Sequence, residues 1–171
     1  SQEARQGKQK GQTLAELRFA IAGVQLALHA KISDPNVSPH AAPWKGSCIE
    51  VFGSMPGGSR IGQVFLSPQS GDTPAKAYIA KGDKQEATKQ IRIQTNKTGS
   101  GYELKALIPT ELLAWDITKE KFLLEFQVTT MAKAKKSKAV RGTLFRSSLA
   151  YLDNSRYGVF VLKKKEMQED K

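Results

Sequence analysis

The chain has 171 residues, of which 39% are hydrophobic, and its formal net charge is +11. This length predicts one domain with a sizeable core, and the hydrophobic content excludes a disordered chain. One cysteine and two histidines exclude an intrachain disulfide and a zinc site of the multi-cysteine type. No apolar run is long enough to span a membrane as a helix.

Both ends of the chain are polar. Residues 1–13 lack the apolar stretch that a signal peptide needs, so they are predicted to be a linker or a disordered start. Residues 166–171 are predicted to be a charged tail. The folded domain is expected between these segments, over residues 14–165.

The first hydrophobic pattern of the domain has a period of two. It runs through residues 16–22 and, after Gly23, through residues 24–33, which predicts a β-hairpin. Leu28 lies on the apolar face of the second strand and His29 on the other face. We therefore expect His29 to face solvent rather than to bind a ligand.

Further short strands follow, separated by segments rich in glycine, proline and serine. Residues 34–43 and 53–59 have the composition of loops and turns, and residues 110–115 are the one segment compatible with a short helix. Strands are expected at 47–52, 61–67, 75–80, 89–95, 101–109, 122–130, 139–145 and 157–163. Nine or ten short strands with little helix predict an all-β fold, an antiparallel β-sandwich or barrel.

The sequence has no pattern typical of an enzyme: GxSxG, HExxH, P-loop and dinucleotide-binding motifs are all missing. Glu50, Glu103 and Glu125 lie on predicted strands and are candidates for a catalytic pair of carboxylates. A carboxylate on a strand is more often solvated or bound in a salt bridge. The chain is therefore predicted not to be an enzyme.

The basic residues gather at the two ends and in the loop 133–138, without an aromatic RNA-binding strand or a DNA-recognition helix. No nucleic-acid partner is therefore predicted. Asp34, Asp72 and Asp153 are single loop acids, not the dense cluster that a hard cation needs. Neither a metal nor a cofactor is expected.

Two large aromatic residues stand in predicted loops, Trp44 just before a strand and Tyr151 in a polar segment. Such side chains carry about 150–250 Å² of surface, so they either cap the core or bind a ligand. The pattern alone leaves both interpretations open. Trp115 follows an apolar segment and is expected at the edge of the core.

The order and spacing of five segments resemble the family 9 carbohydrate-binding modules and their DOMON-like relatives. The segments are ELRFAIAGVQLALHAKISDP, APWKGSCIEVF, GYELKALIP, FLLEFQVTT and DNSRYGVFVL. The resemblance runs from about Glu16 to Leu162 and implies a β-sandwich that binds a polysaccharide or oligosaccharide without catalysis. It also implies an accessory module, joined to a glycoside hydrolase or lyase domain in the same parent chain, in an extracellular or periplasmic location.

In the sugar-binding members of this family, two aromatic side chains clamp a terminal sugar unit and polar side chains bind its hydroxyls. By this resemblance Trp44 is the first clamp residue, and Tyr151 takes the place of the second, which is a tryptophan in the family. Glu50 and Gln127 match polar residues of the family pattern.

The chain departs from the family pattern at several positions. A basic residue of the family falls near Phe65 or Gln63, an asparagine falls on Ser148, and an acidic residue is replaced by Ser47. The opening strand of the family is not recognisable in residues 1–13. These departures concern the ligand more than the fold.

The net charge leaves both a neutral and an anionic glycan open as the ligand. For an anionic glycan, the expected contributors are Arg146 and Arg156, on either side of Tyr151, and the lysines of the loop 133–138. The alternative is a solvated basic surface that keeps the domain soluble.

Two other functions stay open. One is a structural or interaction sandwich of a larger secreted protein, with a degenerate sugar site. The other is a haem-binding DOMON-type module, which uses methionine and histidine as axial ligands. Met55 or Met131 together with His29 or His40 would supply that pair.

Overall fold

The computed structural model describes residues 2–6, 13–131, 139–145, 147 and 149–162. Over these residues the chain forms twelve strands and two short 3₁₀ helices, η1 (Pro43–Lys45) and η2 (Thr110–Leu113). The strands are β1 (Gln2–Gln6), β2 (Thr13–Ala22), β3 (Gln25–Ser33), β4 (Cys48–Ser54), β5 (Gly62–Ser67), β6 (Lys76–Lys81), β7 (Lys84–Thr88), β8 (Arg92–Lys97), β9 (Gly101–Pro109), β10 (Lys121–Met131), β11 (Ala139–Thr143) and β12 (Gly158–Val161). No helix within the described ranges is long and apolar enough to cross a membrane.

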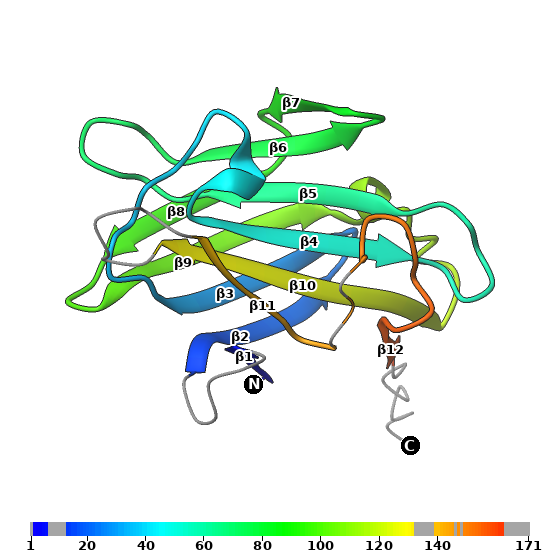
Figure 1. Ribbon diagram of the computed structural model, residues 1–171. Helices are drawn as coiled ribbons and strands as arrows, with labels where there is room; N and C mark the ends of the chain where they lie inside the picture. Colours follow the sequence, from blue (N-terminus) through cyan, green and yellow to red (C-terminus); the bar gives the residue numbers. More distant parts are fainter. Residues whose placement is uncertain (1, 7–12, 132–138, 146, 148, 163–171) are drawn as a thin grey trace, which may run out of the picture.

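The strands form two antiparallel layers that pack face to face (Figure 1). Hydrogen-bonded neighbours follow the order β7-β6-β5-β4-β10-β11-β1-β2-β3-β9-β8, and β12 pairs with the first half of β10. The front layer contains β7, β6, β5, β4 and β10, and the back layer contains β8, β9, β3 and β2. β11 and β1 join the two layers at one edge. The expected all-β antiparallel sandwich with little helix is therefore confirmed.

The core lies between the layers and is made by alternate residues of the strands. Leu28 of the back layer and Phe126 of the front layer belong to one buried cluster. His29, next to Leu28 in sequence, faces outward and is half-buried, as the alternation predicted. Trp115 is buried against Phe122, with ring centroids 5.2 Å apart, which agrees with its expected place at the edge of the core.

The start of the chain differs from the expectation. Residues 2–6 are not a linker: they form β1, which pairs with β2 on one side and with β11 on the other. This strand was not predicted because its pairing is made by backbone groups, which need no apolar pattern in the sequence. The charged tail 166–171 lies outside the described residues.

One further strand has no counterpart in the sequence expectations. β7 contains KQEAT and pairs only with β6, at the end of the strand order. An edge strand has one solvated side, so a polar composition is compatible with it and even protects it from pairing with other chains. With the two additional strands, β1 and β7, the described residues form twelve strands, against the expected nine or ten.

Candidate functional site

The outer face of the front layer carries a row of side chains that crosses three strands. Gln127 of β10 is paired with Glu50 of β4, which is paired with Phe65 of β5. Because Ile49 and Val51 face the core, the alternation of β4 turns Glu50 to the outer face. These strands and the loops above them enclose a cavity of about 460 Å³.

Five residues selected from the sequence line this cavity together: Trp44, Glu50, Phe65, Gln127 and Tyr151. They come from a loop before β4, from three strands, and from the segment between β11 and β12. The two remaining candidates, Arg146 and Ser148, lie outside the described residues.

Trp44 lies on η1, which rests on β4 and β5. Buried Asp34 anchors the loop that carries Trp44, because it accepts a hydrogen bond from the Ser47 hydroxyl at 2.6 Å. Asp34 also accepts one from the backbone N–H of Met131, at the end of β10, at 3.1 Å. The Trp44 ring lies 6.3 Å from the Phe65 ring, at an angle of 47°. The indole is therefore fixed at the cavity by its loop and by a buried aromatic side chain beneath it.

Tyr151 also lines the cavity and is 56% exposed. Its loop is anchored on both sides. Asn154 donates hydrogen bonds to the Ser54 hydroxyl and the Gly58 carbonyl, both at 2.8 Å, and the Tyr157 hydroxyl donates to the Ala150 carbonyl. Trp44 and Tyr151 thus border one cavity from two independently anchored loops.

Glu50 lies at the bottom of the cavity and is 3% exposed. One of its carboxylate oxygens accepts a hydrogen bond from the Gln127 amide at 2.7 Å, and the other accepts one from the Gln63 amide at 2.9 Å. Burial raises the pKa of Glu50, while the two amides and, more weakly, the nearby charge of Arg141 oppose that rise. The carboxyl group is therefore held in one orientation by both of its oxygens.

Seven of the lining residues were not selected as site residues from the sequence, and two of these, Gln63 and Arg141, contact residues that were selected. Gln63 was named only as a neighbour of the family's basic position. Arg141 of β11 donates a hydrogen bond to the Trp44 carbonyl at 2.9 Å. Only the pairing of β11 with β10 brings Arg141 to the cavity, so the sequence held no local signal for it.

Few of the residues that line the cavity are charged. Glu50 and Asp83 are acidic, Arg141 is basic, and the amides of Gln63 and Gln127 are neutral. Amides and carboxylates offer both donors and acceptors to a ligand that is rich in hydroxyl groups.

The three strand carboxylates considered for catalysis do not come together. Glu125 is buried and accepts backbone N–H groups of Phe126, Leu144, Phe145 and Ser147, so it orders the chain after β11. Glu103 contacts His29 on the outer face of the other layer. Glu50 is the one of the three that borders the cavity.

Three of the residues considered for haem binding, His29, His40 and Met55, have protein partners of their own. His29 contacts Glu103, the Nδ1 atom of His40 accepts the Ala42 backbone N–H, and the Met55 sulfur accepts the Asp116 backbone N–H. In the described part of the chain, no three His, Cys, Asp or Glu side chains form a group able to hold a metal ion.

No family model and no curated protein matches the chain. Two similar solved structures are of a family 9 carbohydrate-binding module from Caldicellulosiruptor kristjanssonii, one in complex with cellotriose and one with glucose. The first has a TM-score of 0.67 and 19% identity, over 98% of this chain and 84% of the other. The second has a TM-score of 0.64 and 18% identity, over 99% and 88%. The chain therefore has the fold of family 9 carbohydrate-binding modules.

Proposed function

We propose that this protein is a non-catalytic carbohydrate-binding module that holds a sugar unit in the cavity between Trp44 and Tyr151. The proposal rests on one observation: five residues selected from the sequence line one cavity. One of them, Glu50, is buried and accepts hydrogen bonds from the amides of Gln63 and Gln127. The shared fold with modules in complex with cellotriose and glucose supports it.

The chemistry of the cavity suits a pyranose ring. A sugar has apolar C–H faces, which pack against aromatic rings such as those of Trp44 and Tyr151, and hydroxyls at its edges. A carboxylate has about four lone-pair sites, and the two amides occupy one on each oxygen of Glu50. The remaining lone pairs accept sugar hydroxyls, and Arg141 and the glutamine amides supply donors.

The described lining favours a neutral sugar in this cavity. Glu50 and Asp83 contribute two negative charges against the single positive charge of Arg141. A carboxylate or sulfate on the ligand would be repelled by those acids. Of the basic residues considered for an anionic glycan, Arg156 is exposed and does not line the cavity. Arg146 and the lysines of the loop 133–138 lie outside the described residues.

Calorimetric titration with glucose, cello-oligosaccharides and xylo-oligosaccharides tests the proposal. Trp44→Ala should lower affinity by at least about 30-fold, which corresponds to the roughly 2 kcal/mol of a binding hot spot. Leu152→Ala removes an exposed apolar side chain next to Tyr151 and serves as the matched control. A folded Trp44→Ala protein with wild-type affinity, or a wild type that binds none of these sugars, would favour the structural-sandwich alternative.

We further propose that the module assists a polysaccharide-degrading enzyme, as a neighbour of a glycoside hydrolase or lyase domain in one extracellular or periplasmic chain. The resemblance to family 9 supports this role. Deletion of the module from the parent enzyme should lower activity on insoluble polysaccharide and leave activity on soluble oligosaccharides unchanged. Equal losses on both substrates would contradict an accessory role.

A further inference from the structure

The outer face of the back layer carries a second depression, on the side of the sandwich away from the cavity. It has a volume of about 600 Å³ and lies over β2, β3, β9 and β8. Its floor is a row of small and aliphatic side chains: Ala20 is paired with Ala27, and Ala27 with Leu107. Arg92 of β8 is paired with Leu107 and ends this row.

A row of basic side chains runs beside this aliphatic floor. Arg18 of β2 is paired with His29 of β3, and His29 with Lys105 of β9. Neighbouring strands lie about 4.8 Å apart, so this row across three strands extends over about 10 Å. We call the outward residues Arg18, His29, Lys31, Arg92 and Lys105 the basic face.

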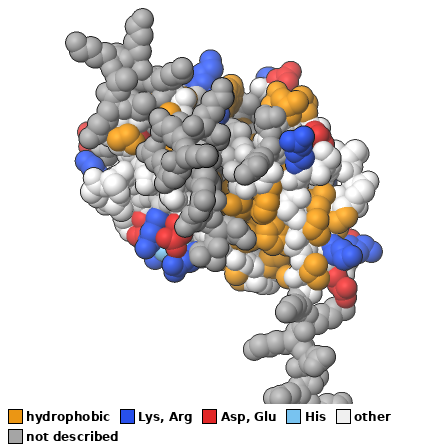
Figure 2. All heavy atoms as spheres, turned by 60° about the horizontal axis from the view of Figure 1, so that its bottom comes forward, with side chains coloured by type: hydrophobic (Ala, Val, Ile, Leu, Met, Phe, Trp, Pro, Cys, Tyr) orange, Lys and Arg blue, Asp and Glu red, His pale blue; other side chains and the backbone are white. Residues whose placement is uncertain are grey.

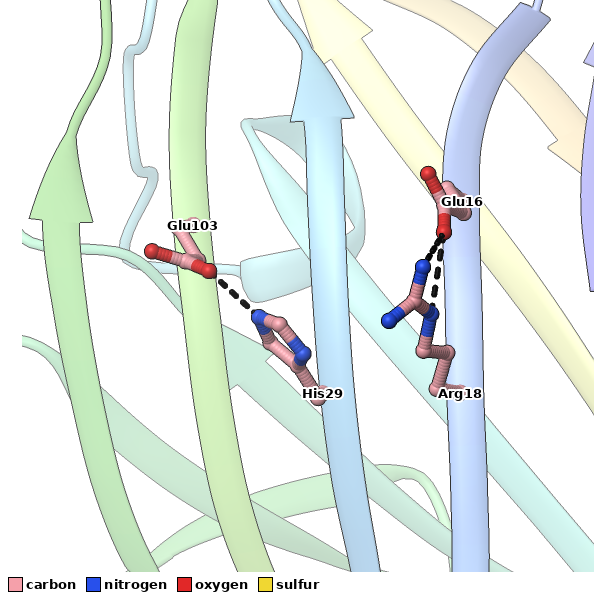
Figure 3. A network of polar contacts seen from close by, with 4 residues as sticks. All are labelled: Glu16, Arg18, His29 and Glu103. Atoms are coloured by element: carbon pink, nitrogen blue, oxygen red, sulfur yellow. Dashed lines mark hydrogen bonds and ion pairs between the residues drawn. The ribbon is translucent and has the colours of Figure 1, made fainter. Parts of the chain in front are cut away.

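The acidic residues on the same side are already bound. Glu16 accepts a hydrogen bond from Arg18 at 2.7 Å, and Glu103 contacts His29 (Figure 3). Lys31, Arg92 and Lys105 are exposed and, within the described part of the chain, have no carboxylate within 4.0 Å. Four Lys and Arg side chains against two Glu leave an excess of positive charge on this face.

The space-filling view shows how the two kinds of side chain are distributed. Lys, Arg, Asp, Glu and His side chains gather at the lower left, and a separate band of hydrophobic side chains lies in the centre and right of the view (Figure 2). The residues that line the depression itself combine an apolar floor, Ala20, Ala27 and Leu107, with the basic side chains of Arg92 and Lys105.

We propose that the basic face is a second binding site, for a polysaccharide that carries carboxylate or sulfate groups. The C–H faces of its sugar rings lie on Ala20, Ala27 and Leu107. Its anionic groups pair with the Arg92 guanidinium and the Lys105 ammonium, charge-assisted contacts that are stronger than neutral hydrogen bonds.

The surface chemistry favours an acidic polysaccharide over nucleic acid. Proteins that bind single strands without sequence preference stack the bases on aromatic side chains. On β2, β3, β8 and β9, all fully described, His29 is the only aromatic ring at an outward position, and Phe19 points into the core, 5.2 Å from the Phe126 ring. Aliphatic floors with charged borders suit sugar rings that bear acidic groups.

The test uses polygalacturonate as the acidic polymer and its fully methyl-esterified form as the uncharged control with the same backbone. Binding of the 171-residue protein is measured by calorimetry between about 0.01 M and 0.15 M salt, where the Debye length falls from about 30 Å to 8 Å. We expect binding to polygalacturonate that weakens with salt, and at least tenfold weaker binding to the ester. Equal affinity for both polymers would overturn the proposal.

Charge-reversal variants locate the site. Arg92→Glu combined with Lys105→Glu should reduce polygalacturonate affinity at least tenfold. Lys76→Glu combined with Lys119→Glu changes the net charge equally at exposed positions off the basic face, and should reduce it less than threefold. Equal losses in the two double variants would mean that overall charge, not this face, holds the polymer, and would overturn the proposal. Melting curves confirm that each variant is folded.

Two further measurements separate this inference from the cavity. Trp44→Ala should bind polygalacturonate with wild-type affinity, although its affinity for neutral sugars is reduced. The proposal for the basic face and the proposal for the cavity can therefore be disproved separately. A single-stranded DNA oligonucleotide of equal charge should bind at least tenfold more weakly than polygalacturonate. Equal affinity for the DNA, lost in the Arg92→Glu and Lys105→Glu variant, would overturn recognition of a polysaccharide.

Discussion

Glu50 combines two properties that conflict in a protein interior: it is almost fully buried and it carries an ionisable group. Its two oxygens accept amide hydrogen bonds from Gln127 and Gln63, and Arg141 contributes a nearby positive charge. These contacts offset part of the desolvation, but burial prevails and the pKa of Glu50 is raised. The carboxyl group of Glu50 is therefore protonated at a higher pH than that of a solvent-exposed glutamate.

Glu50→Gln is expected to weaken sugar binding more than Gln127→Ala does, because a hydrogen bond to a charged acceptor contributes roughly 1.5–3 kcal/mol, against about 1 for a neutral one. Wild-type affinity should also decrease as pH falls through the raised pKa of Glu50, since a protonated carboxyl group accepts fewer hydrogen bonds. The affinity of Glu50→Gln should not change over that range. Titrations at several pH values measure both effects, and a pH-independent wild type would contradict them.

Stability should respond to pH in the opposite direction. Because the pKa of Glu50 is higher in the folded than in the unfolded protein, the folded state binds this proton more tightly. The contribution of Glu50 to the free energy of unfolding therefore increases as pH falls through the raised pKa and is lost as pH rises. The difference in unfolding free energy between wild type and Glu50→Gln, followed over this pH range, isolates this contribution from those of other groups.

Arg141 acts on the cavity through two neighbours. It donates to the Trp44 carbonyl at 2.9 Å, which ties η1 to β11, and its charge lowers the pKa of Glu50. Arg141→Gln is expected to reduce sugar affinity roughly two- to tenfold, the equivalent of one hydrogen bond, and to move the pH midpoint of binding upward. Arg92→Gln removes an exposed arginine on the other layer and should change neither. An unchanged midpoint in Arg141→Gln would leave Arg141 with a purely structural role.

At the scale of elements, η2 packs directly on the backbone of β4 and β5. Gly53 and Gly62 are paired across these strands, and a Cβ at either position would lie 2.3 Å from a carbonyl oxygen of η2. Gly53→Ala is therefore expected to destabilise the protein by about 1–3 kcal/mol, as overpacking does. Gly99→Ala is the control, because no heavy atom lies within 4 Å of its Cβ position. Equal midpoints of denaturant unfolding for both variants would contradict this account.

At the scale of the whole molecule, the sandwich separates the cavity from the basic face. The cavity lies on the outer face of the front layer and the basic face on that of the back layer. Packed sheets lie about 10 Å apart, with the core between them. A module of this shape has room to hold a neutral and an acidic polysaccharide at the same time.

The two proposed sites are expected to be independent. Saturation with cellotriose should leave the dissociation constant for polygalacturonate unchanged within about twofold, because effects at sites more than about 7–10 Å apart without shared partners are usually additive. Calorimetric titration of the acidic polymer with and without cellotriose measures the coupling. Displacement of one ligand by the other would show that they share a site.

The sequence by itself determined which side chains enter the core and which face outward. Successive side chains of a strand point to opposite faces, so the alternation separates Leu28 from His29 and Ile49 from Glu50 without further information. The order of the recognised segments also selected Trp44 and Tyr151, two residues that the structure places on one cavity.

Only the tertiary structure decided which outward residues become neighbours. Gln127 meets Glu50 because β10 lies beside β4, although the two strands are far apart in the chain. Arg141 reaches Trp44 by the pairing of β11 with β10, and β1 pairs with β2 and β11 without any apolar pattern. The physical reason is that strands pair through backbone hydrogen bonds common to all residues, so the choice of partner depends on how the whole sheet packs.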